Sequence, residues 1–234
     1  PITVKADAAA LLPKLVWHMD EPMSDATSIP TYLLSQETKK HCTVVLTGEG
    51  SDEVFGGYVQ YKIMKLHEKF LRARSTAVRK CLYSIASATP TVILNKIFKY
   101  TEGLGKEGMK RYRHFLHTND YGEQYIDLVS IFSEEEKKEL FDAQHQYLIS
   151  QQQLVSRMNL YFNNQNDLLN NLLLLETDII LVDDLLMKMD KNTMAFGVEA
   201  RVPFLDHPLV EYGATLPPSL KLRGNTEKYI LRRA

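Results

Sequence analysis

Hydrophobic and polar positions near the start of the chain follow a helical pattern. Apolar residues at helical spacing come after Asp7, a good helix N-cap, and the Glu21-Pro22 pair predicts that this helix ends before it. A second helix is predicted over residues 28–40, with a proline in its first turn. Residues 2–4 are a short β-prone piece. The chain is therefore expected to begin with a strand end followed by two helices.

The segment Cys42–Leu46 is the clearest strand signal in the sequence. It is short, apolar and rich in β-branched residues, and Gly48 follows it closely, which is typical of a fully buried parallel strand. The order helix, buried strand, glycine-rich turn and helix is typical of an open α/β sheet.

Almost all of the sequence after Val59 has a helical pattern. Amphipathic stretches are predicted near residues 59–73, 75–88, 91–101 and 104–116. Ser133 and Glu136 form a capping-box pattern that begins another helix. A long pattern over residues 166–194 is apolar on too many faces for a surface helix and is expected to cross the interior. A last short helix is predicted to begin near Thr226.

Composition and charge narrow the class of protein. The chain has 234 residues, 44% of them hydrophobic, and a formal net charge of -1. This balance argues against nucleic-acid or membrane partners and favours small, roughly neutral ones. Two cysteines make a disulfide framework unexpected, and no apolar run approaches the ~20 residues of a membrane span. A cytoplasmic protein of a reducing compartment is expected.

A glycine-rich, acidic loop follows the predicted buried strand at Thr47–Tyr58. Ligands of open α/β sheets bind beyond the carboxyl ends of the strands, where this loop is expected. The glycines let backbone approach a phosphate or a ribose, and the acidic side chains suit an anion that arrives with Mg²⁺. Glu49, at the end of the strand, is expected to be partly desolvated, with a raised pKa that suits proton transfer. The alternative is that the glycines only turn the chain and the carboxylates are solvated.

Two further segments near the end of the chain carry charged groups among core-type residues. In Asp190–Asp206, Arg201 is expected either to line a substrate site or to be held in a buried ion-pair network by Glu199 or Asp206. Lys228 lies in the basic segment after Thr226 and is by itself typical of a solvent-exposed lysine.

His114 and His117 are spaced as i and i+3 on a predicted helix. Because no third ligand is evident, surface or packing roles are favoured over a metal site.

Together, the Thr47–Tyr58 loop, the Glu199–Asp206 segment and the Lys228–Arg232 segment resemble the synthetase domain of the asparagine synthetase (glutamine-hydrolysing) family. The resemblance spans essentially the whole chain, with the segments in family order. It implies a helix-rich α/β fold, in which part of an adenine-nucleotide alpha-hydrolase-like (Rossmann-like) parallel sheet is followed by a largely helical region.

The resemblance also implies a function. A carboxylate, aspartate in the first place, is activated by ATP as an acyl-adenylate with release of pyrophosphate, and ammonia from glutamine then forms the amide. ATP and Mg²⁺ are the expected cofactors. The expected partners are the small carboxylate and a glutaminase domain that supplies ammonia. Whether the chain also forms a homo-oligomer is left open.

The roles that the resemblance implies fall on residues of the three segments. Glu49 takes the proton from the attacking ammonia, and Lys228 stabilises charge on the α-phosphate and the pyrophosphate. The nucleotide and pyrophosphate are bound by Thr47, Gly48, Gly50, Ser51 and Asp52, of which Asp52 also holds Mg²⁺. Tyr58, Glu199 and Arg201 are expected to line the substrate site.

Family members carry an N-terminal glutaminase domain and an S-G-G-x-D-S-S pyrophosphate loop that are absent from this sequence. A fragment of one synthetase domain is therefore expected, with a sheet and pyrophosphate-loop part at 1–58 and a mainly helical part at 59–234, inactive when isolated.

Two local departures from the family pattern leave the substrate open. Val59-Gln60-Tyr61 replaces the usual segment after Gly-Gly-Tyr, and Ala26 stands where aspartate-using members often carry arginine. Amidation of a sugar or peptidyl carboxylate is the alternative. A non-catalytic nucleotide-binding or interaction module is a further one, although a decayed domain would be expected to have lost Glu49, Asp52 or Lys228.

Overall fold

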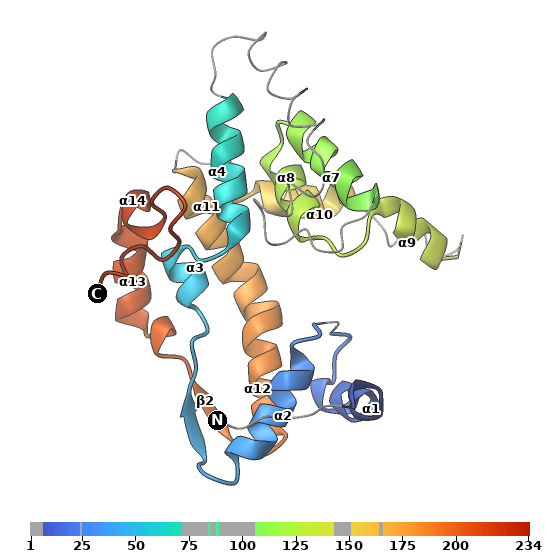
Figure 1. The fold of residues 1–234 in the computed structure, drawn as a ribbon, viewed down its shortest axis with the longest axis vertical. Helices are drawn as coiled ribbons and strands as arrows, with labels where there is room; N and C mark the ends of the chain where they lie inside the picture. The colour runs from blue at the N-terminus through green and yellow to red at the C-terminus, as the bar shows by residue number, and fades with distance from the viewer. Residues whose placement is uncertain are drawn as a thin grey trace. The chain divides into compact units, whose positions relative to one another are not determined.

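The computed structural model describes residues 7–23, 25–71, 84, 88, 106–142, 151–163 and 166–234. The chain forms two compact units: the first contains residues 1–57 and 173–234, and the second contains residues 58–172 (Figure 1). The long C-terminal segment thus belongs to the same unit as the glycine-rich loop. The β-prone residues 2–4 and nearly all of the predicted helices 75–88 and 91–101 lie outside the described residues. None of the described helices has the length and apolar character that crossing a membrane requires.

Helices α1 (Ala8–Met19) and α2 (Ser28–Thr38) of the first unit pack against each other and against α12 (Met187–Met194). Asp7 caps α1, accepting a hydrogen bond from the backbone N–H of Ala10 at 3.2 Å. The buried ring of Tyr32 packs edge-on against Phe196, with ring centroids 4.6 Å apart. The predicted positions of both helices are confirmed.

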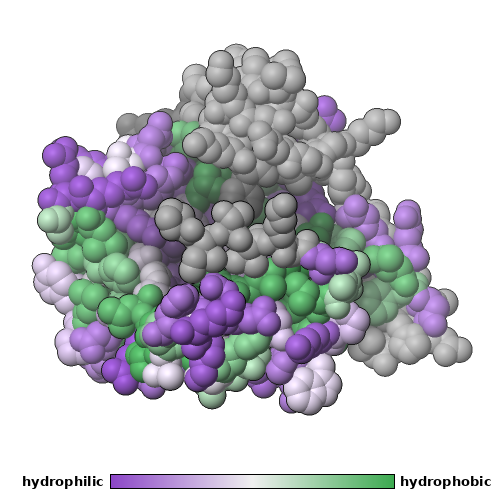
Figure 2. All heavy atoms as spheres, turned by 60° about the horizontal axis from the view of Figure 1, so that its bottom comes forward, coloured by the Kyte–Doolittle hydropathy of each residue, from purple (hydrophilic) through white to green (hydrophobic). Residues whose placement is uncertain are grey.

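A two-stranded parallel sheet, formed by β1 (Val44–Leu46) and β2 (Glu199–Arg201), joins the two halves of the first unit. The helix-rich α/β class and the parallel pairing are confirmed. The prediction of a fully buried strand is wrong: β1 is shorter than expected, and Val44 and Leu46 are 40% and 73% exposed. Its apolar side chains reach the surface because, among the described residues, β2 is its only strand neighbour. Hydrophobic and hydrophilic residues are intermixed on the face drawn in Figure 2.

The long interior helix is confirmed over α11 (Leu168–Leu175), the π-helix η2 (Glu176–Leu186) and α12, which follow one another without a break. Leu169, Leu172 and Leu175 are fully buried. A π-helical stretch of 11 residues is unusual, since such turns occur mostly singly and frequently at functional sites. The hydrophobic pattern predicts a helix here but does not distinguish a π-helix from an α-helix.

A small hydrophobic core includes residues of the glycine-rich segment itself and supports it. Val54 and Phe55 of α3 (Ser51–Phe55) form it with Leu216. The helices packed around it are η3 (Pro203–Leu205), α13 (His207–Thr215) and α14 (Pro218–Lys221). In Figure 1, α13 and α14, drawn in red, lie beside α3. Gly213 allows α13 to approach α3, because a Cβ there would lie 2.4 Å from Val54 Cγ1.

The predicted helix near Thr226 is wrong. Residues 223–226 form an isolated bridge closed by Gly224 (φ 58°), and the chain continues to residue 233 in successive turns. Lys228 itself has φ 47°, which a right-handed helix does not accommodate.

The described secondary-structure elements of the second unit are all helices. Its central helix, α8 (Tyr121–Val129), contacts three neighbours. The unit also contains α4 (Val59–Leu71), α7 (Lys106–His117), α9 (Glu134–Leu140), α10 (Gln151–Asn159) and residues 168–172 of α11. The predicted helices 59–73 and 104–116 are confirmed over their described residues, 59–71 and 106–116. The capping box is confirmed too: Ser133 and Glu136 exchange side-chain to backbone hydrogen bonds at 2.7 and 3.2 Å.

His67 is a buried titratable residue of the second unit. His67 Nε2 lies 3.3 Å from the Leu116 carbonyl oxygen, and its ring packs 4.8 Å from that of Phe115. Burial lowers the pKa of His67 below its ordinary value of 6.5, although its hydrogen bonds with Leu116 and Gln124 oppose this.

We therefore predict that the second unit loses stability as the pH falls below 6.5. A group whose pKa is lowered by folding binds its proton more readily in the unfolded chain, so acid favours unfolding. Hydrogen exchange of α8 amides at about pH 7 and pH 5 will measure this. The His67→Gln variant should lose the part of the pH dependence that comes from His67. The His207→Gln variant, which alters an imidazole that is 86% exposed, should retain it. An equal pH dependence in the His67→Gln variant would contradict the assignment.

Candidate functional site

The first residues of the glycine-rich loop are held against β2 and η3 of the first unit. Thr47 donates its backbone N–H to the Arg201 carbonyl at 2.9 Å, which extends the parallel pairing into the loop. Gly50 has φ 85°, and a Cβ there would lie 2.1 Å from the Leu205 side chain. Only glycine fits this position, since both the backbone conformation and the contact exclude a side chain.

Lys228 joins the end of the chain to this loop. Its Nζ lies 2.7 Å from Asp52 Oδ1 and donates to Ser51 Oγ at 2.8 Å. Its backbone N–H donates to the Gly56 carbonyl at 3.3 Å. Lys228 is thereby brought to the neighbouring residues Ser51 and Asp52, more than 170 positions earlier in the chain, and is not the free surface lysine that its local sequence indicated.

Gly57 leaves the space that this ion pair occupies. A Cβ at Gly57 would lie 1.6 Å from Asp52 Oδ1 and 2.4 Å from Lys228 Cε. Gly48 differs, since nothing lies within 4 Å of its Cβ position and its backbone is open to an incoming ligand.

Glu49 is half-buried between charged groups of both signs. Burial raises its pKa above the ordinary value of 4.5. The Lys188 charge opposes this, and the negative charges of Glu53, Asp52 and Asp184 add to it. The raised pKa agrees with the expectation from the sequence. Its cause differs in part, because the strand that precedes Glu49 is exposed.

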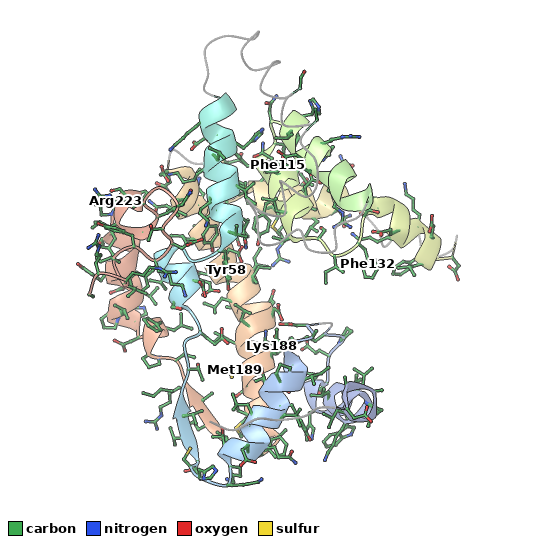
Figure 3. All side chains as sticks on the ribbon, in the orientation of Figure 1. Tyr58, Phe115, Phe132, Lys188, Met189 and Arg223 are labelled. Atoms are coloured by element: carbon green, nitrogen blue, oxygen red, sulfur yellow. The ribbon has the colours of Figure 1, made fainter. Side chains whose placement is uncertain are left out.

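Sequence reasoning missed a second cationic position, Lys188 on α12, which is labelled in Figure 3. Lys188 is 5% exposed, and its Nζ donates a hydrogen bond to Asp25 Oδ2. Asp25 also accepts from the N–H and the hydroxyl of Thr27, both at 2.8 Å. Burial acts to raise the pKa of Asp25, but the hydrogen bonds from Lys188 and Thr27 outweigh it and hold the pKa below its usual value. The available signal was the position of this lysine within residues 166–194, the pattern that is expected to cross the interior.

Glu199 and Arg201 form an ion pair, with Arg201 Nε 2.8 Å from Glu199 Oε1. The expectation of a buried network is wrong, because these side chains are 57% and 63% exposed. They lie on β2, whose central residue alone is half-buried, and alternate positions of a strand face the same side. Such an exposed pair contributes about 1 kcal/mol or less to stability, which leaves both groups available to a ligand.

Tyr58, the first residue of the second unit, packs edge-on against Tyr61 with ring centroids 5.6 Å apart (Figure 3).

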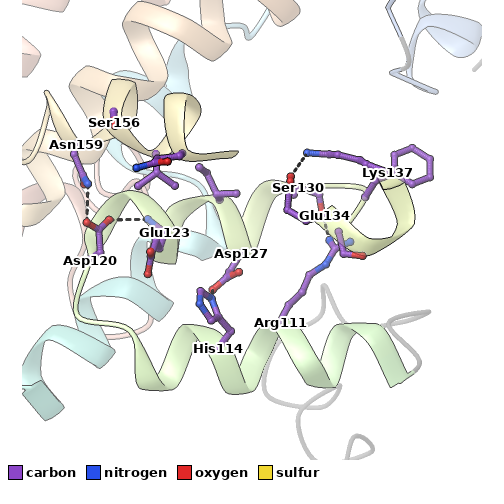
Figure 4. Close-up of a pocket in the computed structure, with 15 residues that line it drawn as sticks. Arg111, His114, Asp120, Glu123, Asp127, Ser130, Glu134, Lys137, Ser156 and Asn159 are labelled. Atoms are coloured by element: carbon purple, nitrogen blue, oxygen red, sulfur yellow. Dashed lines mark hydrogen bonds and ion pairs between the residues drawn. The ribbon is translucent and has the colours of Figure 1, made fainter. Parts of the chain in front are cut away.

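The second unit contains a polar cavity of about 680 Å³ that His114 lines (Figure 4). His114 Nδ1 lies 2.7 Å from Asp127 Oδ2, so this histidine is engaged with a carboxylate. Asp120 and Asn159 are likewise hydrogen-bonded to each other, at 2.7 Å. Nowhere in the described part of the chain do three His, Cys, Asp or Glu side chains gather as a metal site.

The chain belongs to the asparagine synthase family, since residues 2–234 match the model of that family. It is 34% identical over 224 residues to asparagine synthetase [glutamine-hydrolyzing] 1 of Bacillus subtilis, covering 95% of this chain and 32% of the relative. It is 31% identical over 238 residues to a putative asparagine synthetase [glutamine-hydrolyzing] of Mycobacterium bovis, covering 99% and 33%. A third relative, amidase chry2 of Gibberella zeae, is 27% identical over 261 residues, covering 99% and 36%. No solved structure matches the chain.

The chain thus spans about a third of the length of these curated relatives.

We predict that Gly57→Ala separates Lys228 from Asp52. Because the new methyl group occupies the position of the Asp52 carboxylate, the variant should lose about 1–3 kcal/mol of unfolding free energy, as overpacked sites do. Urea unfolding will measure the change. Gly48→Ala is the matched control, expected within about 0.5 kcal/mol of the unmodified chain because its Cβ position is open. Equal losses in the two variants would show that the loop backbone, not the ion pair, is what the substitution disturbs.

Proposed function

We propose that this chain is the nucleotide-binding synthetase part of an enzyme that forms an amide from a carboxylate and ammonia at the expense of ATP. Family membership supports the class of reaction. The observation that carries the site is the convergence of Lys228, Asp52 and Ser51 on the glycine-rich loop, directly after β1. In this proposal the parallel pair β1 and β2 is part of a larger nucleotide-binding sheet.

The phosphate side of the site consists of the loop and Lys228. The open backbone at Gly48, with Thr47, Gly50 and Ser51, would contact the nucleotide and the pyrophosphate. The hydroxyl oxygen of Thr47 is buried without a hydrogen-bond partner among the described residues, which fits a group that waits for a ligand. Lys228 would neutralise the charge that develops on the phosphates.

Mg²⁺ fits the acidic part of this loop. The ion prefers one or two carboxylates together with phosphate oxygens and waters, so a site without three clustered protein ligands is typical of it. Asp52, which is partly exposed, would hold it, and its role would be to neutralise phosphate charge. Because Asp52 pairs with Lys228 in this structure, binding of the ion would redirect that carboxylate.

The chemistry proposed has two steps. A carboxylate oxygen of the acceptor bonds to the α-phosphorus of ATP, and the bond to pyrophosphate breaks. The nitrogen of ammonia then bonds to the activated carbonyl carbon, AMP leaves with the electrons of the broken carbon–oxygen bond, and Glu49 takes the surplus proton. A half-buried carboxylate with a raised pKa is a better proton acceptor than a solvated one.

Similarity to proteins named asparagine synthetase [glutamine-hydrolyzing] supports aspartate as the acceptor. In this proposal a glutaminase part of the whole protein supplies the ammonia. Amidation of another carboxylate is the second candidate. It is favoured by the absence of a basic residue between Asp20 and Ile29 and by the similarity to a protein named amidase.

The test uses the full-length parent protein with Mg-ATP, ammonium chloride and a panel of carboxylates headed by aspartate. Glu49→Gln should slow amide formation by about 10²-fold or more but retain exchange of labelled pyrophosphate into ATP. Lys228→Ala should diminish both. Glu211→Gln and Lys40→Ala, which alter exposed residues, should diminish neither. Absence of pyrophosphate release with every carboxylate would favour a non-catalytic module instead.

The pH dependence of amide formation is a separate prediction. Because Glu49 acts as a base only when deprotonated and burial raises its pKa, the acidic limb of the rate profile should lie above the ordinary glutamate value of 4.5. Lys188→Met should move this limb to still higher pH, because the Lys188 charge favours the ionised carboxylate. A limb that does not move in this variant would exclude Glu49 as the group that titrates.

A further inference from the structure

Asp184, a residue of the π-helix η2, has a buried carboxylate oxygen that nothing in the described part of the chain satisfies. Its Oδ1 is inaccessible to solvent and has no hydrogen-bond partner. An unsatisfied buried acceptor costs about 1–3 kcal/mol, and such groups in native proteins mark sites where a ligand, an ion or water completes the bonding.

The surroundings of Asp184 show which ligand chemistry fits. Asp184 interacts electrostatically with Lys188, Asp25 and Glu49. The one cation of this group, Lys188, is already committed to Asp25 by a hydrogen bond. The carboxylates therefore outnumber the cation, and a further anion would be repelled whereas a donor with positive charge would be attracted.

We propose that Asp184 is a binding residue of the site and that its Oδ1 accepts an N–H from ammonia or from a protonated amino group. This inference rests on the proposed function, which brings Glu49 and a nitrogen nucleophile together. Burial raises the pKa of Asp184, which agrees with a carboxylate that lacks its partner. The donor has two sources: the ammonia that attacks, or the amino group of an amino-acid acceptor.

The two sources make different predictions for Asp184→Asn in the full-length parent. If Asp184 binds ammonia, the KM for ammonium chloride should rise about tenfold or more, with the KM for every carboxylate unchanged. If it binds the amino group of the acceptor, the KM for aspartate should rise as much, whereas turnover of succinate, which lacks that group, should not change. The KM for ATP should be unaffected in both cases.

Two variants separate binding from a structural role. Asp183→Asn removes the neighbouring exposed carboxylate and should change no KM. Asp184→Glu keeps the charge beside Lys188 but moves the oxygens, so it should not restore the KM. If Asp184 only balances Lys188, Asp184→Glu will restore stability and Asp184→Asn will leave both nitrogen-related KM values unchanged, which overturns the proposal.

Calorimetric titration of the unmodified parent and of Asp184→Asn with aspartate, succinate and ammonium chloride keeps the test independent of turnover. If the parent releases no pyrophosphate, the proposed function fails. Weaker binding of aspartate or of ammonium by Asp184→Asn would then still support the site, and identical binding would overturn it.

Discussion

The ion pair between Lys228 and Asp52 is the contact on which the arrangement of the site depends. It joins the turns near the end of the chain to a loop more than 170 residues earlier, and it positions Ser51 at the same time. The contact exists because Gly57 has no side chain to fill the space. The core of Val54, Phe55 and Leu216 supports it, since this core fixes α3 against the segment that carries Lys228.

The charged residues of the site form two groups, each with one lysine. Lys228 is bonded to the groups of the loop, whereas Lys188 lies on α12 and is bonded to Asp25. The pKa of Glu49 is influenced by the positive charge of Lys188 and by the negative charges of Asp52 and Glu53 in the loop and of Asp184 in η2. Removing either partner of the Asp25–Lys188 pair would leave an uncompensated charge. The pair joins α12 to the segment that precedes α2. The proton acceptor of the proposed reaction is thus influenced by one buried lysine, Lys188, and by a larger number of carboxylates.

The local features of the fold could be predicted from the sequence, because each depends on a few neighbouring residues. The N-cap at Asp7, the capping box at Ser133 and the interior helix that includes Leu172 are of this kind. The exposure of Leu46 could not be predicted, because it depends on which elements cover the strand. The pairing of Lys228 with Asp52 could not be found from spacing either, since it joins segments far apart in the chain. The resemblance to a family pointed to Lys228, whereas Lys188 and Asp184 matched no motif.

The backbone of Lys228 shows how strongly its position is determined. A non-glycine residue at φ 47° is strained by about 1 kcal/mol or more, and such a conformation persists only where several contacts hold it. Here the backbone N–H is bonded to Gly56 and the ammonium to Asp52 and Ser51. A helix starting at Thr226 would give up these contacts, because a right-handed conformation at Lys228 redirects its side chain. The requirement to place one ammonium group against the loop therefore explains why a segment with helical residues forms turns.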